Sequence, residues 1–125
     1  PEGGKRPLSS MSPILIFDKN YNFLFSIGSP GGTAIIAYVF KNIVDILYLN
    51  IDPLDAVNSV NYLKKGEKIF VEKGKYKKRQ FDMIKRSNEK IIPIPLTSGL
   101  GIIIKKNDIL FGIEDSRRDG NVFAK

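Results

Sequence analysis

The apolar stretch from Ala34 to Leu49 restricts the fold of this chain more than any other feature. Polar or charged residues interrupt it, and it is shorter than the ~20 apolar residues that a bilayer-spanning helix needs, so we predict no membrane span. We expect a buried helix from Thr33 to about Leu49 that is apolar around most of its circumference. Such a helix is stable when other parts of the protein cover it on several sides.

Two short apolar strands precede this helix. The segments SPILIFD (Ser12 to Asp18) and FLFSIG (Phe23 to Gly28) flank the polar turn KNYN, which predicts a β-hairpin. Both segments carry apolar residues on both faces, as strands do in a sheet that is covered on two sides. We therefore expect these strands to lie inside a layered structure.

The middle of the chain is expected to alternate helices and strands. A short helix is predicted in LDAVNSVNYL after Pro53, with Asp52 as its N-cap. A strand at Lys68 to Gly74 follows, and then an amphipathic helix at Lys75 to Asn88. The apolar side of that helix carries Phe81 and Ile84, beside Met83.

The last third of the sequence is expected to be β-structure. The segment KIIPIPL (Lys90 to Leu96) contains two prolines, which restrict it to the edge of a sheet or to an extended connection. Two apolar segments on either side of a turn at Lys106 to Asp108 predict a hairpin. Strands with apolar helices around them predict a layered α/β or α+β protein. No domain boundary is visible, so we treat residues 1–125 as one domain.

The positive charge of the chain is concentrated in one segment. The net charge is +7, and Lys64 to Lys90 contains eleven Lys or Arg residues against four Asp or Glu residues, while the rest of the chain is balanced. Such a segment can bind nucleic acid or anionic lipid, or it can form a solvated helix and loop in a lysine-rich protein. Few aromatic residues accompany the lysines and no nucleic-acid-binding motif is present. We therefore favour the second interpretation and predict no nucleic-acid partner.

The chain contains no cysteine and no histidine. These absences exclude disulfides, thiolate metal sites and Ser-His triads within the chain, and we predict neither a metal ion nor a cofactor. Any catalytic contribution must come from hydroxyls, backbone amides, carboxylates or amines.

Two turns rich in serine or glycine place such groups beside the first strands. In PLSSMSP, Ser9 and Ser10 lie between two prolines, and adjacent hydroxyls with exposed N–H groups can bind a carboxylate. In GSPGGT, Gly31 and Gly32 lead from a strand into a helix whose first N–H groups have no internal acceptor, which can form an anion or oxyanion site. Each turn also has a purely structural explanation, because serines before strands and glycines in tight turns are common.

In this order, the motifs GKRPLSSMSP, GSPGG and D-x-RRDG (Asp115 to Gly120) resemble the C-terminal part of the small subunit of gamma-glutamyltranspeptidases. The resemblance covers nearly the whole chain and is strongest over Gly4 to Pro13 and Gly28 to Thr33. Members of that family are N-terminal-nucleophile hydrolases. The resemblance therefore implies an α+β fold, a partial layered sandwich of the αββα type.

The resemblance also implies a reaction and a set of site residues. In the family, an N-terminal threonine released by self-cleavage of a precursor attacks the gamma-glutamyl amide of glutathione, and water or an acceptor amine resolves the gamma-glutamyl enzyme. By this resemblance, Ser9 and Ser10 hold the α-carboxylate of the substrate, and Gly31 and Gly32 supply the N–H groups of the oxyanion hole. We expect these two turns to lie close together around one site.

The nucleophile of the family lies upstream of PLSSMSP, and this sequence does not contain it. Thr33 and Thr97 are internal and have no free α-amine to act as base. We therefore expect a C-terminal portion of a small subunit that acts on glutathione or another gamma-glutamyl compound. Its partners would be the large subunit and the upstream segment of the same precursor.

Two further expectations accompany this interpretation. The resemblance implies a periplasmic or secreted protein. The alternative to the enzymatic interpretation is an inactive fragment or a non-catalytic binding module that uses the basic segment Lys64 to Lys90.

Overall fold

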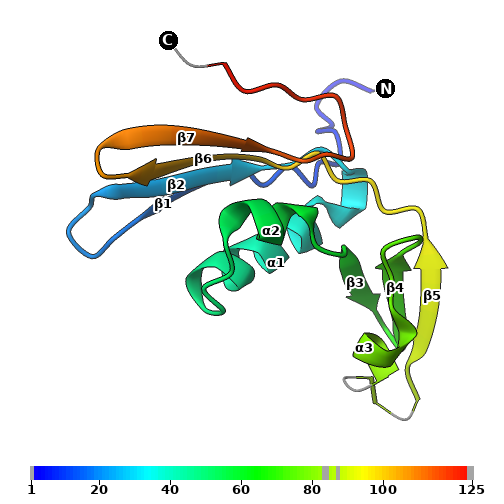
Figure 1. The fold of residues 1–125 in the computed structure, drawn as a ribbon. Helices are drawn as coiled ribbons and strands as arrows, with labels where there is room; N and C mark the ends of the chain where they lie inside the picture. Colours follow the sequence, from blue (N-terminus) through cyan, green and yellow to red (C-terminus); the bar gives the residue numbers. More distant parts are fainter. Residues whose placement is uncertain (1, 83–84, 87, 124–125) are drawn as a thin grey trace.

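The computed structural model describes residues 2–82, 85–86 and 88–123. Within these residues the chain forms a four-stranded antiparallel sheet, a helical layer on one face of it, and a smaller three-stranded sheet beside the helices (Figure 1). The larger sheet has the strand order β1-β2-β6-β7. Its strands are β1 (Ile14–Phe17), β2 (Phe23–Gly28), β6 (Gly101–Lys106) and β7 (Ile109–Glu114).

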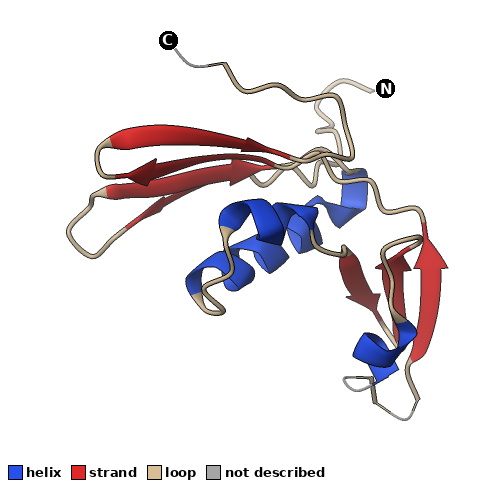
Figure 2. Ribbon diagram, viewed as in Figure 1, coloured by secondary structure: helices blue, strands red, loops and turns tan. Residues whose placement is uncertain are grey.

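Helix α1 (Ile35–Leu47) packs against the larger sheet and forms the main core with it. A short 3-10 turn, η1 (Gly32–Ala34), precedes α1, and α2 (Pro53–Asn58) follows it. Figure 2 shows these helices on one side of the larger sheet, while the C-terminal segment runs over the other side. The buried residues of this core include Phe25, Ile27, Leu100 and Ile102 together with Ile35, Tyr38, Val39 and Val57.

The smaller sheet has the strand order β3-β4-β5 and a small core of its own. Its elements are β3 (Tyr62–Lys65), β4 (Lys68–Glu72), α3 (Lys78–Asp82) and β5 (Lys90–Ile94). Strands β3 and β4 are antiparallel, whereas β4 and β5 are parallel. Ile69, Val71 and Phe81 form the core, and the ring of Tyr62 packs edge-on against Phe81 with centroids 5.7 Å apart.

Most of the elements expected from the sequence are present. The β1–β2 hairpin and α1 lie where they were predicted, and Asp52 caps α2 by accepting a hydrogen bond from the Leu54 N–H at 2.9 Å. Strand β5 lies at an edge of its sheet, as its prolines require. The turn between β6 and β7 is shorter than expected. Only Asn107 and Asp108 separate the strands, both with positive φ, which is the geometry of a two-residue hairpin turn.

The second helix is shorter than predicted. Helix α2 ends at Asn58, so the expectation that it continues to Leu63 is wrong. The reason is a tertiary contact: the backbone N–H of buried Asn61 donates to the Glu72 carboxylate at 2.9 Å, and the chain then pairs with β4 as strand β3.

The third helix is also short. Of the helix predicted for Lys75 to Asn88, the described residues form α3 alone, and residues 75–77 form a turn and coil. Helix α3 begins with Lys78 and Arg79. Positive charge at a helix N-terminus interacts unfavourably with the helix dipole and therefore disfavours a longer helix here. Phe81 is buried as expected, whereas Met83 and Ile84 lie outside the described residues. In the described part of the chain, no helix has the length and apolar character to span a membrane.

Candidate active site

The turn between β2 and α1 requires glycine at two positions. Gly31 has a φ of 142° and Gly32 a φ of 58°, both in the region that favours glycine. A Cβ on Gly31 would lie 2.6 Å from Cε2 of Tyr38, whereas a Cβ on Gly32 would meet no described atom within 4 Å. The turn therefore packs tightly against α1 at Gly31 and faces open space at Gly32.

The first N–H groups of this turn make no hydrogen bond to a described residue. The Ala34 N–H donates to the Gly31 carbonyl at 3.3 Å. Within the part of the chain that the structure describes, the N–H groups of Gly31, Gly32 and Thr33 have no acceptor, and no side chain caps the helix start. Unpaired N–H groups at the start of a helix attract anions, because the positive end of the helix dipole is located there.

A cleft of about 650 Å³ borders these N–H groups and has a cationic lining. Residues 31–34 form part of its wall, and residues of α1, β3, β4, β5, the β5–β6 connection and the segment after β7 form the rest. Lys65 and Arg118 are its charged residues, Thr33 and Thr97 contribute to the lining, and no acidic residue among those described lines it. Positive charge combined with free amide donors suits an anionic ligand or a developing oxyanion.

The β5–β6 connection holds the glycine turn in place. The Gly99 N–H donates to Ser29 Oγ at 3.2 Å, and the Ser29 hydroxyl donates to the Pro30 carbonyl at 2.7 Å. A Cβ on Gly99 would lie 2.8 Å from Cγ of Pro30 and 2.6 Å from Cδ of Arg118, so glycine is required for this approach. No local pattern predicts the contact, because it joins residues 70 positions apart.

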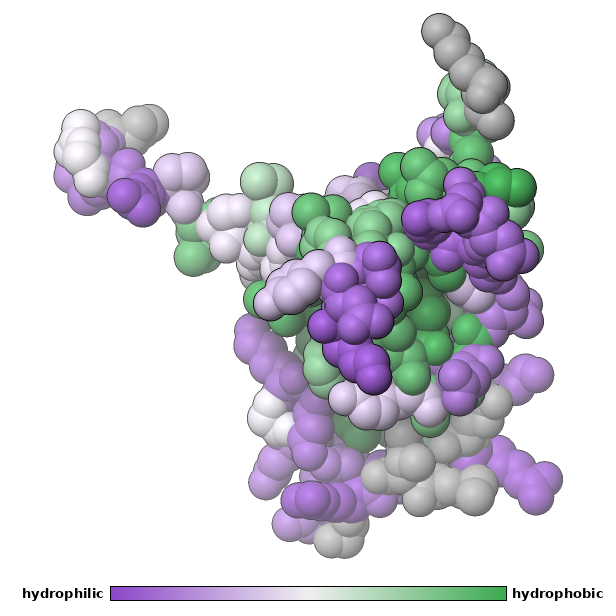
Figure 3. All heavy atoms as spheres, turned by 90° about the vertical axis from the view of Figure 1, so that its left-hand side faces the viewer, coloured by the Kyte–Doolittle hydropathy of each residue, from purple (hydrophilic) through white to green (hydrophobic). Residues whose placement is uncertain are grey.

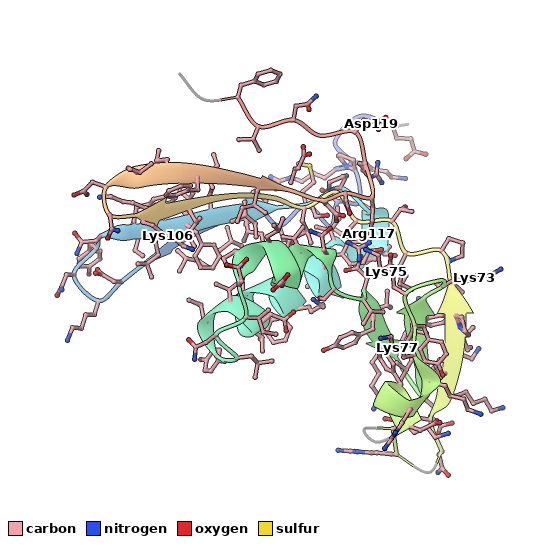
Figure 4. The ribbon with its side chains drawn as sticks, in the orientation of Figure 1. Lys73, Lys75, Lys77, Lys106, Arg117 and Asp119 are labelled. Carbon is pink, nitrogen blue, oxygen red and sulfur yellow. The ribbon has the colours of Figure 1, made fainter. Side chains whose placement is uncertain are left out.

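Arg117 forms a buried ion cluster between the two sheets (Figure 4). Its Nε and Nη2 atoms each donate to Glu72 at 2.7 Å, and Nη1 donates to Asp115 at 2.9 Å. The same guanidinium also donates to the carbonyls of Val57 at 2.8 Å and Ser59 at 2.5 Å. The cluster joins α2, β4 and the segment after β7, and it thereby fixes the smaller sheet, which carries part of the cleft wall, relative to the larger sheet.

Hydrogen bonds keep this cluster charged. Burial raises the pKa of Asp115, but hydrogen bonds from the Ser98 hydroxyl and from Arg117 outweigh burial, and the pKa lies below its usual value. Burial lowers the pKa of Arg117, because it disfavours the charged guanidinium. The hydrogen bonds to Glu72 and Asp115 outweigh burial here too, so the pKa of Arg117 lies above its usual value. The buried side chain of Asn61 donates to Ser98 Oγ at 2.8 Å and extends the network. In the sequence, the D-x-RRDG motif marks Asp115 and Arg117 of this cluster, but it does not indicate that they bind Glu72 and Ser98.

Ser9 and Ser10 lie in the irregular segment before β1. The Met11 N–H donates to Ser9 Oγ at 3.2 Å, and the Ser12 hydroxyl donates to the Ser10 carbonyl at 3.1 Å. Neither Ser9 nor Ser10 is among the residues that line the cleft. The structure therefore brings both predicted glycines to the cleft and leaves the two predicted serines outside its lining. That the two turns share one site stays a prediction.

Nearly the whole sequence matches one known family. The family model of gamma-glutamyltranspeptidase matches residues 1–124. The chain belongs to the gamma-glutamyltranspeptidase family. It is 28% identical over 116 residues to the glutathione hydrolase proenzyme of Escherichia coli, a match that covers 90% of this chain and 20% of that protein. It is 41% identical over 58 residues to glutathione hydrolase 3 of Arabidopsis thaliana, covering 46% of this chain and 9% of that one.

Solved structures share the fold of this gamma-glutamyltranspeptidase chain. A mutant of Helicobacter pylori gamma-glutamyltranspeptidase matches with a TM-score of 0.81 and 27% identity, covering 94% of this chain and 66% of that one. A mutant enzyme from Pseudomonas nitroreducens matches with a TM-score of 0.86 at 20% identity, which supports the fold alone. The fold is therefore α+β, a partial N-terminal-nucleophile hydrolase sandwich, as the motifs predicted. The chain spans about a fifth of the length of its Escherichia coli relative.

Proposed function

We propose that this chain supplies the oxyanion-binding part of a site for gamma-glutamyl transfer and glutathione hydrolysis. Family membership supports this class of reaction in general. The observation that carries the proposal is the glycine turn, because the N–H groups of Gly31 and Gly32 have no acceptor among the described residues, precede a helix and border a cationic cleft. Amide donors held in a fixed position stabilise the oxyanion of a tetrahedral intermediate.

In the proposed reaction, the nucleophile comes from a segment upstream of residue 1. A threonine hydroxyl there attacks the gamma-glutamyl carbonyl carbon while its own α-amine accepts the hydroxyl proton. The carbonyl oxygen becomes an oxyanion and accepts hydrogen bonds from Gly31 and Gly32. Collapse of the intermediate breaks the amide bond, and the leaving amine takes the proton. Water or an acceptor amine then attacks the ester, and the gamma-glutamyl group leaves as the free acid or as a new amide.

Ser9 and Ser10 are the proposed donors to the α-carboxylate of glutathione or of another gamma-glutamyl compound. Ser9 Oγ accepts a hydrogen bond from a backbone N–H, so its own proton remains available for donation. The positive charges of Lys65 and Arg118 in the cleft attract an anionic substrate. For the serines to contact bound substrate, the segment before β1 must lie over the cleft in the complete enzyme.

The outer face of the larger sheet is the proposed contact surface for the rest of the precursor. Leu15, Ile103 and Leu110 are between 48% and 64% exposed there. Residues of this face and of the C-terminal segment line a groove of about 1450 Å³. Figure 3 looks along the larger sheet from the end that carries the β6–β7 turn and shows hydrophobic side chains in the middle of the molecule, with charged side chains around them. We propose that the large subunit and the upstream segment cover this face and that residues 1–125 act as one domain with them.

A substitution at Gly32 tests the oxyanion role in the complete gene product that contains this chain. A Cβ at Gly32 meets no described atom within 4 Å, so Gly32→Ala leaves packing within the chain intact. In this proposal the added methyl hinders the close approach of the reacting carbonyl to the turn, and displacement of a reacting carbonyl by about 1 Å costs about a hundredfold in rate. We expect a loss of kcat of about that size with a gamma-glutamyl anilide.

The control for this experiment is thermal stability. The positive φ of Gly32 is strained for alanine by about 1–2 kcal/mol, so a small decrease in melting temperature is expected. Normal turnover per folded molecule in Gly32→Ala would show that Gly32 is a structural residue and would contradict the proposal.

A further inference from the structure

The smaller sheet carries three lysines in one row across its strands. Strand pairing places Lys65 opposite Lys68, and Lys68 opposite Lys90. Residues directly opposite each other in a sheet project from the same face. All three residues are exposed, and none of them forms an ion pair with a described residue. We call Lys65, Lys68 and Lys90 the lysine row.

The face that carries the lysine row continues into the cleft. Two positions along the strands, Leu63, Phe70 and Ile92 lie opposite one another and share this face. Leu63 and Phe70 line the cleft, as do Lys65 from the row and Ile94 at the far end of β5. One continuous surface therefore runs from the lysine row, over apolar side chains, to the free N–H groups of the glycine turn.

The lysine row has an electrostatic cost that a ligand would relieve. Like charges directly opposite each other in a sheet are destabilising. Two acidic residues of the same region are engaged elsewhere, since Glu72 pairs with Arg117 and Glu89 pairs with Lys64. The hydrogen bond from Lys64 also holds the pKa of Glu89 below its usual value. Exposed Glu67 lies in the turn between Lys65 and Lys68, so one carboxylate stands beside three lysines and the row keeps a net positive charge in the described structure.

We propose that the lysine row and the adjoining cleft bind an extended acidic peptide. Acidic side chains of the peptide would pair with the row, and an anionic end would reach Arg118 and the glycine turn. From Lys90 to Ile94 the strand advances about 13 Å, at ~3.3 Å per residue, which matches a peptide of about four extended residues. The inference rests on the proposed function of the cleft, because Lys65, Arg118 and the glycine turn belong to both sites; the binding titration below tests it separately from turnover.

The shape and composition of this surface favour a peptide over other polyanions. A bilayer is flat, whereas the surface leads into a cleft of about 650 Å³. Single-stranded nucleic acid binds through exposed aromatic rings that stack on bases. On this face the aromatic residue is Phe70, which is partly buried, and Tyr62 projects from the opposite face, where it packs on Phe81. An acidic peptide can pair its carboxylates with the lysines and pack its aliphatic parts against Leu63 and Phe70, which line the cleft.

The test is a binding titration of the complete gene product with N-acetylated tetraglutamate, using tetraglutamine as the uncharged probe of equal length. At low ionic strength we expect tetraglutamate to bind and tetraglutamine not to bind. Lys68→Gln should weaken it about two- to fivefold, the effect of one exposed ion pair, and substitution of all three lysines should weaken it further. Lys106→Gln is the matched control, because it removes one exposed charge at the far end of the larger sheet (Figure 4) and should leave the affinity unchanged.

A second measurement separates binding from stability. Without peptide, Lys68→Gln should raise the melting temperature, because it removes repulsion from both neighbouring lysines, while the same substitution weakens binding. Equal weakening by Lys106→Gln, equal binding of tetraglutamine, or tighter row-dependent binding of a single-stranded oligonucleotide would each overturn the proposal.

Discussion

Arg117 uses five N–H donors on buried or partly buried acceptors, which is the full capacity of a guanidinium. Replacing it with methionine leaves Glu72 and Asp115 buried with like charge, and breaking such a pair costs about 3–5 kcal/mol. Arg117→Lys should rescue little, because an ammonium cannot form the bidentate contact with Glu72. Chemical denaturation of the complete gene product measures both free energies of unfolding.

Arg118 is the control at the adjacent position. It is exposed, and its side chain donates to the carbonyls of Ser98 and Thr97 at 3.2 Å. Arg118→Gln should therefore lower the free energy of unfolding much less than Arg117→Met. Equal losses for the two arginines would show that the buried cluster is not what holds the sheets together.

At the scale of elements, a buried lysine connects α1 and α2. Lys41 Nζ donates to Asp45 at 2.5 Å on its own helix, and to Ser59 Oγ at 2.5 Å and the Ala56 carbonyl at 3.2 Å. Lys41→Met leaves the Asp45 carboxylate without its cation, so we expect a loss of about 3 kcal/mol in the free energy of unfolding.

A double-mutant cycle tests this pair. Lys41→Met combined with Asp45→Leu removes both charges and should recover most of the stability lost by the single lysine variant, because apolar replacement of a buried pair is often neutral. If the double variant loses the sum of both single effects, the two charges do not interact and the connection between the helices has another origin.

At the scale of the whole molecule, the 125-residue chain lacks the threonine that the proposed reaction needs. We expect the purified chain to show no hydrolysis or transfer of a gamma-glutamyl anilide above background. Activity that vanishes in Thr33→Ala would mean that an internal threonine of the cleft acts as the nucleophile, and the proposed origin of the nucleophile would then be wrong.

The apolar outer face of the larger sheet belongs to the same scale. Leu15, Ile103 and Leu110 are exposed on this face, and we propose that a partner covers them, because exposed apolar surface of this kind marks interaction sites. The C-terminal segment already touches this face, since a Cβ on Gly112 would lie 2.5 Å from Cγ1 of Val122. This contact explains why glycine stands at that position of β7.

Local sequence patterns determined most of the elements and the family. The β-hairpins, helix α1, the Asp52 cap and the turn at Gly31 and Gly32 depend on residues that are adjacent or nearly adjacent in the chain. Hydrophobic pattern, capping side chains and the freedom of glycine at positive φ act over that range. For the same reason, three short motifs were sufficient to indicate a gamma-glutamyltranspeptidase.

Tertiary structure alone decided how those elements form a site. Helix α2 ends early because Asn61 bonds to Glu72, and the cleft wall is held by Arg117, whose partner Glu72 is 45 positions away. The lysine row exists because β3, β4 and β5 pair in one particular register. Such contacts join residues that are distant in the chain, and their energies depend on burial and on the partner, which no local pattern encodes.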